Sequence, residues 1–361
     1  IYMSESANNN YNMGLIGIIL VSLAAVMGVR NFPSMALVGW QLITFSILAV
    51  ILFLIPASLT SAELATGWSG EGAVYLWVKE AFGEKWGFTA VWLQWFNMLV
   101  VFIGVLTFLA ATFSYIFNPS LQDSKLYQLL VIVIVCWVFT FINFRGIKTY
   151  TKLNSIFVII GSFIPCILLI CVGLWLIGTG HPVFLNLPPT FSDVIPDFSN
   201  LKNLSLILTF VVIFSGIEMT AFHLVDIKNV KRNYPISLFV VSAVIIFVPG
   251  FCSLIISLFV SESSLNMVGG VMQCFEVIFG VGIVTAFIAL LTCIGPLGQV
   301  SAWILGPVRG LLVSAKDGNL PPILQKTNDE GMPVNMMILQ AIVITFWGVI
   351  YVILPGGVNG S

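Results

Sequence analysis

Met27-Gly28-Val29-Arg30-Asn31-Phe32-Pro33 interrupts an apolar segment that otherwise runs from about Met13 to Leu54. An arginine at the centre of a membrane helix costs roughly 2.5–3.5 kcal/mol on insertion scales. Proline removes a backbone donor and clashes with the preceding turn, and the glycine weakens the helix in front of it. A helix broken inside a bilayer is tolerated only where it is buried in protein or lines a watery cavity. The stretch therefore predicts a discontinuous first membrane helix, which is where secondary transporters bind their substrates.

The composition is that of an all-α polytopic membrane protein. The chain is 59% hydrophobic and 8% charged, whereas soluble domains are about 25% charged. A net charge of −1 gives no reason to expect a nucleic acid partner. The six cysteines lie mostly in apolar runs and show no C-x-x-C spacing, so neither disulfides nor a metal site is predicted. No cofactor is predicted either.

Apolar runs near twenty residues long predict nine spans: 13–39 (broken), 41–62, 86–117, 126–144, 152–178, 204–225 (broken), 235–260, 281–308 and 334–354. Residues 1–12 form a polar tail without the basic region of a signal peptide. Two further segments are too short to span, and the first of them is predicted to be an amphipathic helix. Gly72–Phe82 is expected to lie at the interface with Trp77 as its anchor, and Met267–Phe279 to form a packed or re-entrant hairpin.

The basic residues predict the orientation. Eleven basic residues are expected in loops on one side of the membrane: Lys79, Lys85, Arg145, Lys148, Lys152, Lys228, Lys231, Arg232, Arg309, Lys316 and Lys326. Only Lys125 and Lys202 fall on the other side. Positive residues favour the cytoplasm, so the amino terminus is predicted to be cytoplasmic and the chain to be a multi-pass protein of the cell (inner) membrane.

A second break is predicted at Phe214-Ser215-Gly216-Ile217-Glu218, where a glycine stands beside a carboxylate inside the sixth span. It follows the first break by five spans, and because five is odd the second half would enter the membrane from the opposite side. The resulting organisation is a tail at 1–12, a first repeat at 13–178, an extracytoplasmic loop at 179–203 and a second repeat at 204–361. A five-plus-five repeat needs a tenth span, so we expect the chain to be truncated after the ninth.

Several motifs match a known family in order and spacing: VRNFPSMA at 29–36, FLIPASLTSAELAT at 53–66, EGAVYLWVKEAFG at 71–83, FSGIEMTAFH at 214–223, KRNYP at 231–235 and GPVRGLLVSAKDGNLP at 306–321. On these residues the chain resembles the amino acid–polyamine–organocation superfamily, and within it the glutamate/γ-aminobutyrate antiporter family. The resemblance implies the LeuT fold, with ten core helices in two inverted repeats, and amino acid exchange by alternating access. It also links the glutamate of the second break to proton or substrate sensing.

The chain departs from that family at the first break. The usual glycine-serine-glycine stands here as Val26-Met27-Gly28, and antiporters of the glutamate type commonly carry an aromatic residue at the position of Arg30. These differences bear on the identity of the substrate and leave the place of its site unchanged.

The predicted substrate site consists of Met27, Gly28, Val29, Arg30, Asn31, Ser215, Gly216, Ile217 and Glu218. Unwound backbone at the breaks offers amide and carbonyl groups to an amino acid, although a simple kink is the alternative. Arg30 could grip a substrate carboxylate, pair with Glu218, or extend into the cavity. Glu218 and His223 are the candidates for proton or pH sensing, with hydrogen-bonded packing as the alternative for His223. Other candidates for the pocket are Trp92, Trp95, Asn97, Gln299, Ser301 and Trp303, while Glu63 is expected to order a loop.

Three functions compete. The first is a secondary amino acid antiporter, and the second is a proton-coupled amino acid symporter that would not need substrate on the far side. The third, an intramembrane enzyme, would require a nucleophile–base or metal constellation, and none is visible in the sequence. Filter repeats typical of channels are also not visible. The expected partners are an amino acid, the lipid bilayer and, in the symporter reading, protons; the oligomeric state is left open.

Overall fold

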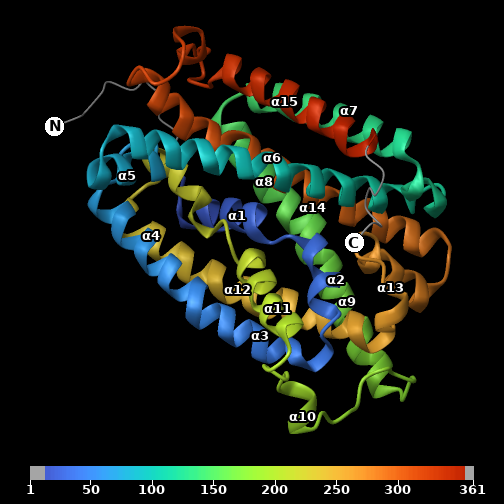
Figure 1. Ribbon diagram of the computed structural model, residues 1–361. Helices are drawn as coiled ribbons and strands as arrows, with labels where there is room; N and C mark the ends of the chain where they lie inside the picture. The colour runs from blue at the N-terminus through green and yellow to red at the C-terminus, as the bar shows by residue number, and fades with distance from the viewer. Residues whose placement is uncertain (1–12, 354–361) are drawn as a thin grey trace.

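The computed structural model describes residues 13–353. It is a bundle of long tilted helices that run alongside one another (Figure 1). Within residues 13–353, nine helical segments are long and apolar enough to cross a membrane: Leu15–Ala36, Gly39–Gly67, Glu84–Ser114, Lys125–Asn143, Ile147–Gly178, Asn203–Asp226, Val230–Phe259, Ile283–Lys316 and Val334–Tyr351. Each overlaps one predicted span, so the prediction of nine spans is confirmed. The predicted tail at 1–12 lies outside the described residues, as does the end of the predicted second repeat, 354–361.

The first five spans are built from elements that bend at prolines and glycines. In chain order they are α1 (Leu15–Val26), η1 (Val29–Asn31), α2 (Phe32–Ala36), η2 (Gly39–Gln41), α3 (Leu42–Ala49), η3 (Val50–Leu54), α4 (Ile55–Gly67), α5 (Val74–Phe82), α6 (Glu84–Ser114), η4 (Pro119–Asp123), α7 (Lys125–Asn143), α8 (Ile147–Val158), η5 (Ile159–Phe163) and α9 (Ile164–Gly178). The segments η3 and η5 are π-helical turns. Each directly precedes a turn that contains a proline, Pro56 or Pro165, because proline cannot donate the regular helical hydrogen bond.

The second half follows the same pattern of long spans and short connecting helices. Its elements are α10 (Phe191–Val194), α11 (Leu201–Ile213), η6 (Ile217–Asp226), α12 (Val230–Phe259), η7 (Glu262–Ser264), α13 (Gly270–Phe279), α14 (Ile283–Lys316), η8 (Pro322–Gln325) and α15 (Val334–Ile353). The segment 267–279 was expected to form a packed or re-entrant hairpin, but it contains the single short helix α13, which packs against α2, α12 and α14. Because successive spans alternate in direction, the connections gather at two ends of the bundle. We call these the α5 end and the α10 end, which Figure 1 shows far apart.

The helix α14 forms the centre of the bundle, in contact with α1, α6, α7, α8 and η6. Its closest approach is to the fifth span, at a pair of glycines. A Cβ placed on Gly161 would lie 1.9 Å from the backbone nitrogen of Gly295, so the two backbones touch where no side chain would fit. Small residues at such crossings permit the close packing that holds membrane helices together.

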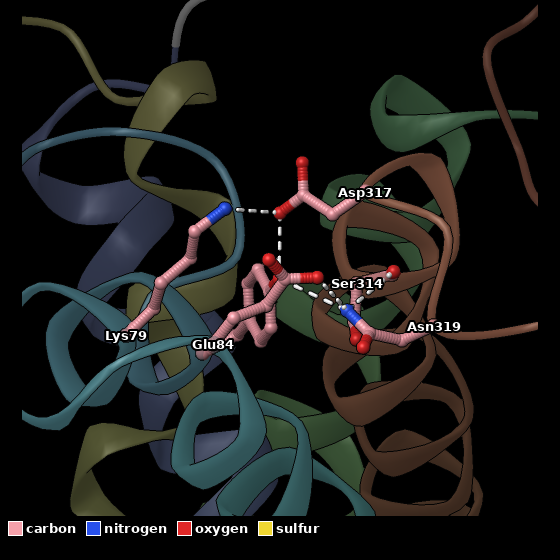
Figure 2. A network of polar contacts seen from close by, with 6 residues as sticks. Lys79, Glu84, Ser314, Asp317 and Asn319 are labelled. Atoms are coloured by element: carbon pink, nitrogen blue, oxygen red, sulfur yellow. Dashed lines mark hydrogen bonds and ion pairs between the residues drawn. The ribbon is translucent and has the colours of Figure 1, made fainter.

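Hydrogen bonds and an ion pair connect the helix α5 to the end of α14 (Figure 2). Lys79 Nζ and Tyr75 Oη both donate hydrogen bonds to Asp317 Oδ2, at 2.7 and 2.6 Å. Asn319 Nδ2 donates to Glu84 Oε1 at 2.9 Å. Burial, and then the hydrogen bond to Asp317, raise the pKa of the Tyr75 hydroxyl. The network ties the connection between spans two and three to the end of span eight.

Three sequence expectations are corrected here. Trp77 of α5 is not an interfacial anchor, because it is buried and its Nε1 donates to the Trp68 carbonyl at 3.1 Å. Arg309 and Lys316 do not lie in a loop, because α14 continues to Lys316. The other basic residues that were expected in loops and lie in helices are Lys79, Lys85, Lys148, Lys152, Lys231 and Arg232. Glu63, expected to order a loop, lies on the exposed surface of the helix α4.

Candidate substrate site

The first break lies where it was predicted. The helix α1 ends at Val26, and Met27 and Gly28 have ψ angles of 72° and 95°, outside the helical range. This ending leaves the Ala25 carbonyl without a helical partner. Two side chains of α14 supply the hydrogen bonds: Gln299 Nε2 at 3.0 Å and Trp303 Nε1 at 2.8 Å. The break is therefore stabilised from the opposite half of the chain, as a discontinuous helix at bilayer depth requires.

The second break differs from the first because it turns at a glycine with a positive φ angle. Between α11 and η6 the chain turns at Gly216, whose φ of +92° lies in the left-handed region that only glycine adopts readily. The sixth span then continues as ten residues of 3₁₀-helix, Ile217–Asp226. Runs of 3₁₀-helix longer than three or four residues are uncommon and mark strained or functional segments.

Trp303 contacts both breaks. While its Nε1 binds the Ala25 carbonyl, its ring lies 3.1 Å from where a Cβ on Gly216 would stand. A second link joins the same two spans, because Ser22 Oγ of α1 donates to Thr220 Oγ1 of η6 at 3.1 Å. The two breaks, almost 190 residues apart in sequence, thus form one unwound region beside α14.

Around this region the predicted residues differ in exposure. Met27, Val29, Gly216 and Ile217 are buried, whereas Arg30, Asn31 and Glu218 are half-buried. Ser215 is exposed, and its hydroxyl donates back to the Val212 carbonyl at 2.7 Å. The backbone and the half-buried polar side chains are thus the groups available to a ligand.

Arg30 and Glu218 do not pair in this structure. Among the described residues, no carboxylate lies within the 4 Å of an ion pair from the Arg30 guanidinium. Arg30 Nη1 lies against Gly104 of α6, whereas Glu218 Oε1 accepts a hydrogen bond from Gln94 of the same helix at 3.4 Å. Gly104 and Gln94 are ten residues apart, which corresponds to about 15 Å along the helix axis. The predicted pair is not formed in this conformation, because each of the two side chains contacts α6 at a different position.

His223 belongs to a buried polar chain at the α5 end. Its Nδ1 lies 3.1 Å from Arg309 Nη1, and its Nε2 lies 3.1 Å from the Tyr150 hydroxyl. Arginine can only donate, so Nδ1 must be the acceptor and Nε2 must carry the proton. The contacts therefore require a neutral imidazole, and a proton on Nδ1 would need Arg309 to move. This geometry favours the hydrogen-bonded packing role over the proton relay.

Arg309 also forms an ion pair with Asp226, the last residue of η6. The backbone of Asp226 accepts a hydrogen bond from the Met13 amide at 2.6 Å, and Lys228 donates back to the Met13 carbonyl at 2.9 Å. Spans one, five, six and eight are thus joined at one point. Sequence reasoning missed this cluster because Arg309 was assigned to a loop.

Four of the predicted pocket residues do not face the breaks. Trp95 Nε1 donates to Gln340 Oε1 of α15 at 2.9 Å, and Ser301 Oγ donates to Asn143 Oδ1 of α7 at 3.1 Å. Trp92 and Asn97 are exposed on the surface of α6. Of the six candidates, Gln299 and Trp303 are the two at the unwound region. Gln94 and Gly104 were missed, although a polar glutamine inside an apolar span is a usable signal; glycine is common in membrane helices and gives none.

Within residues 13–353, nine apolar spans with the first and sixth unwound against each other have the arrangement of the LeuT fold. The search of solved structures agrees: the crystal structure of MhsT in complex with L-phenylalanine matches with a TM-score of 0.69 at 16% identity, over 95% of this chain and 80% of that one. At this identity the likeness concerns the fold alone.

The chain belongs to the amino acid permease family, whose family model matches residues 13–359. An uncharacterised transporter of Legionella pneumophila is 37% identical over 95% of this chain and 74% of its own length. A glutamate/gamma-aminobutyrate antiporter of Lactococcus lactis subsp. lactis is 30% identical over 98% of this chain and 71% of its own length. The resemblance stated from the motifs is therefore confirmed.

Proposed function

We propose that the protein is a secondary active amino acid antiporter that works by alternating access, with exchange of the glutamate/γ-aminobutyrate type. The substrate would bind at the unwound region made by Met27–Asn31 and Ser215–Glu218. The two relatives from Lactococcus lactis that are named glutamate/gamma-aminobutyrate antiporters support this choice of substrates.

The observation that carries the proposal is the meeting of the two breaks at Trp303. Half-helices that end at bilayer depth present partial charges, negative at the carboxyl end of α1 and positive at the amino end of the following segment. An α-amino acid carries an ammonium group, which is attracted to the negative helix end, and a carboxylate, which is attracted to the positive one. Freed backbone groups beside these ends can bind both without a dedicated charged side chain.

A proton-coupled symporter is the second candidate. It is favoured by Glu218, a half-buried carboxylate on the second break that accepts a hydrogen bond from the neutral Gln94. Such a carboxylate could take up a proton with the substrate. We place proton sensing first at Glu218 and second at His223, whose contacts require the neutral ring.

Counterflow in liposomes tests the proposal. The full-length protein is reconstituted, the vesicles are preloaded with each amino acid in turn, and the entry of labelled glutamate is measured. An exchanger shows uptake that depends on internal substrate, whereas a symporter shows uptake into empty vesicles driven by a proton gradient. No amino acid transport under either condition would refute both candidates.

We further propose that the α5 end, which carries most of the basic residues, faces the cytoplasm of the cell (inner) membrane, with the amino terminus on that side. In intact cells a membrane-impermeant thiol reagent should label Ser192→Cys at the α10 end and leave Glu80→Cys at the α5 end unlabelled. Both residues are exposed, and the exposed native Cys171 should first be replaced by serine. The reverse labelling pattern would refute the orientation.

A further inference from the structure

We propose that Arg30 and Gly104 form a subsite for the side-chain carboxylate of an acidic amino acid, and that this subsite makes the transporter selective for charge. The inference rests on the proposed function and adds a specificity-determining pair to it. The subsite lies on the α10 side of the unwound region, between η1 and α6.

The guanidinium of Arg30 has donors to spare. Its Nε is buried and has no hydrogen-bond partner within residues 13–353. A guanidinium carries five N–H donors in a planar fork and stays ionised at every physiological pH. A group of this kind is seldom left inside a protein without a counter-charge, because burying an unpaired charge is costly. The matching ligand is a planar anion with two oxygens, and a carboxylate fits the fork in bidentate geometry.

Gly104 provides the room for this group. A Cβ added to Gly104 would lie 3.0 Å from Arg30 Nη1, with the guanidinium carbon at 3.8 Å. Any side chain at position 104 would therefore press directly on the charged head. Of the guanidinium atoms, Nη1 is the nearest to this turn of α6.

The position of Arg30 assigns the carboxylate that it would bind. Arg30 follows Gly28 by two residues, so it lies next to the freed backbone groups that would hold the α-amino and α-carboxyl groups. Glu218 contacts α6 at Gln94, ten residues before Gly104, and forms no ion pair with Arg30 among the described residues. The positive charge is thus available to the second carboxylate of a dicarboxylic amino acid.

Glutamine is the matched probe for this charge selection. It has the shape of glutamate but offers the guanidinium one acceptor oxygen and a nitrogen donor that would face other donors. Sites built to bind one polar group discriminate strongly against analogues that leave their buried groups unpaired. We expect the wild-type protein to show an apparent affinity at least tenfold higher for glutamate than for glutamine.

The test measures half-saturating concentrations for both substrates in exchange by the full-length protein in liposomes. It is carried out near pH 6, where a side-chain carboxylate with a pKa of about 4.3 is ionised. Arg30→Gln should lower the apparent affinity for glutamate about tenfold or more and change the apparent affinity for glutamine less than about threefold. Arg30→Lys should fall between, since it keeps the charge and loses the fork. Gly104→Ala should shift selectivity in the same direction as Arg30→Gln.

Two matched controls accompany these variants. Arg145→Gln removes an exposed arginine, and Gly67→Ala adds a methyl where nothing lies within 4 Å. Both should keep wild-type selectivity. Because Arg30→Lys and Gly104→Ala retain the positive charge, they keep the test valid if Arg30→Gln does not fold.

The proposed subsite would be refuted if Arg30→Lys and Gly104→Ala lowered the apparent affinities for glutamate and glutamine equally. It would also be refuted if neither affinity changed. Wild-type exchange of neutral amino acids without preference for glutamate would also overturn it while leaving the proposed antiport intact. Absence of exchange with every amino acid would refute the proposed function itself.

Discussion

The ion pair between Arg309 and Asp226 gives the most direct test of how the α5 end is held together. The two side chains are 16% and 14% exposed, so the pair is largely buried. Removing one partner of a buried pair costs about 3–5 kcal/mol, because the remaining charge is left uncompensated. Here some solvent still reaches both groups, so we expect the lower end of this range for Arg309→Gln.

Asp226→Asn should lower the free energy of unfolding by less than Arg309→Gln does. The asparagine oxygen can still accept from Arg309, and the contact between Arg309 and His223 remains. In Arg309→Gln, by contrast, Asp226 and His223 both lose the donor that they share. The double variant carries neither charge, and its loss should be smaller than the sum of the two single losses by about 1–3 kcal/mol.

The measurement is thermal and chemical unfolding of the full-length protein and the three variants in one detergent. Lys79→Gln serves as the control, because its ion pair with Asp317 is about one-third exposed on both sides. Such exposed pairs contribute only about 0–1 kcal/mol. Losses that add within about 0.5 kcal/mol in the double variant would refute the coupling between Arg309 and Asp226.

Three further predictions concern separate parts of the molecule. Glu218→Gln should flatten the dependence of transport on pH between about pH 5 and 7, whereas His223→Gln should leave its shape unchanged; a flat profile for the histidine variant alone would reverse the assignment. For Asp317, partial burial raises the carboxyl pKa, but hydrogen bonds from Lys79 and Tyr75 outweigh it and hold the pKa below its usual range. A lowered pKa stabilises the fold above the unfolded pKa, so Asp317→Asn should lose under about 1 kcal/mol at pH 7, and the difference should shrink as the pH falls below about 4 and vanish only below the lowered pKa of the folded state. Gly161→Ala should abolish folded protein in membranes because its methyl would meet the backbone of Gly295, whereas Gly178→Ala, with nothing within 4 Å, should express normally; equal yields of the two would contradict the close crossing.

The sequence by itself determined the spans and the places where two of them break. Apolar length sets the number of membrane crossings, because about twenty residues are needed to cross the hydrocarbon layer. The breaks were predictable because arginine, glutamate, glycine and proline are costly in a membrane helix wherever its neighbours lie. The end of the eighth span was placed eight residues too early, since Arg309 resembles a loop residue until its partner is known.

Only the tertiary structure decided which side chains meet. The pair between Arg30 and Glu218 was plausible from charge alone, but the two side chains contact α6 at different residues, Gly104 and Gln94. Trp303 looked like any tryptophan of an apolar helix, and its contact with both breaks depends on how α14 is rotated against α1 and η6. The partners of His223 lie 73 and 86 residues away in the chain. Hydropathy sets the depth and length of each helix, but its rotation and its neighbours follow from packing between segments far apart in sequence, which no local pattern encodes.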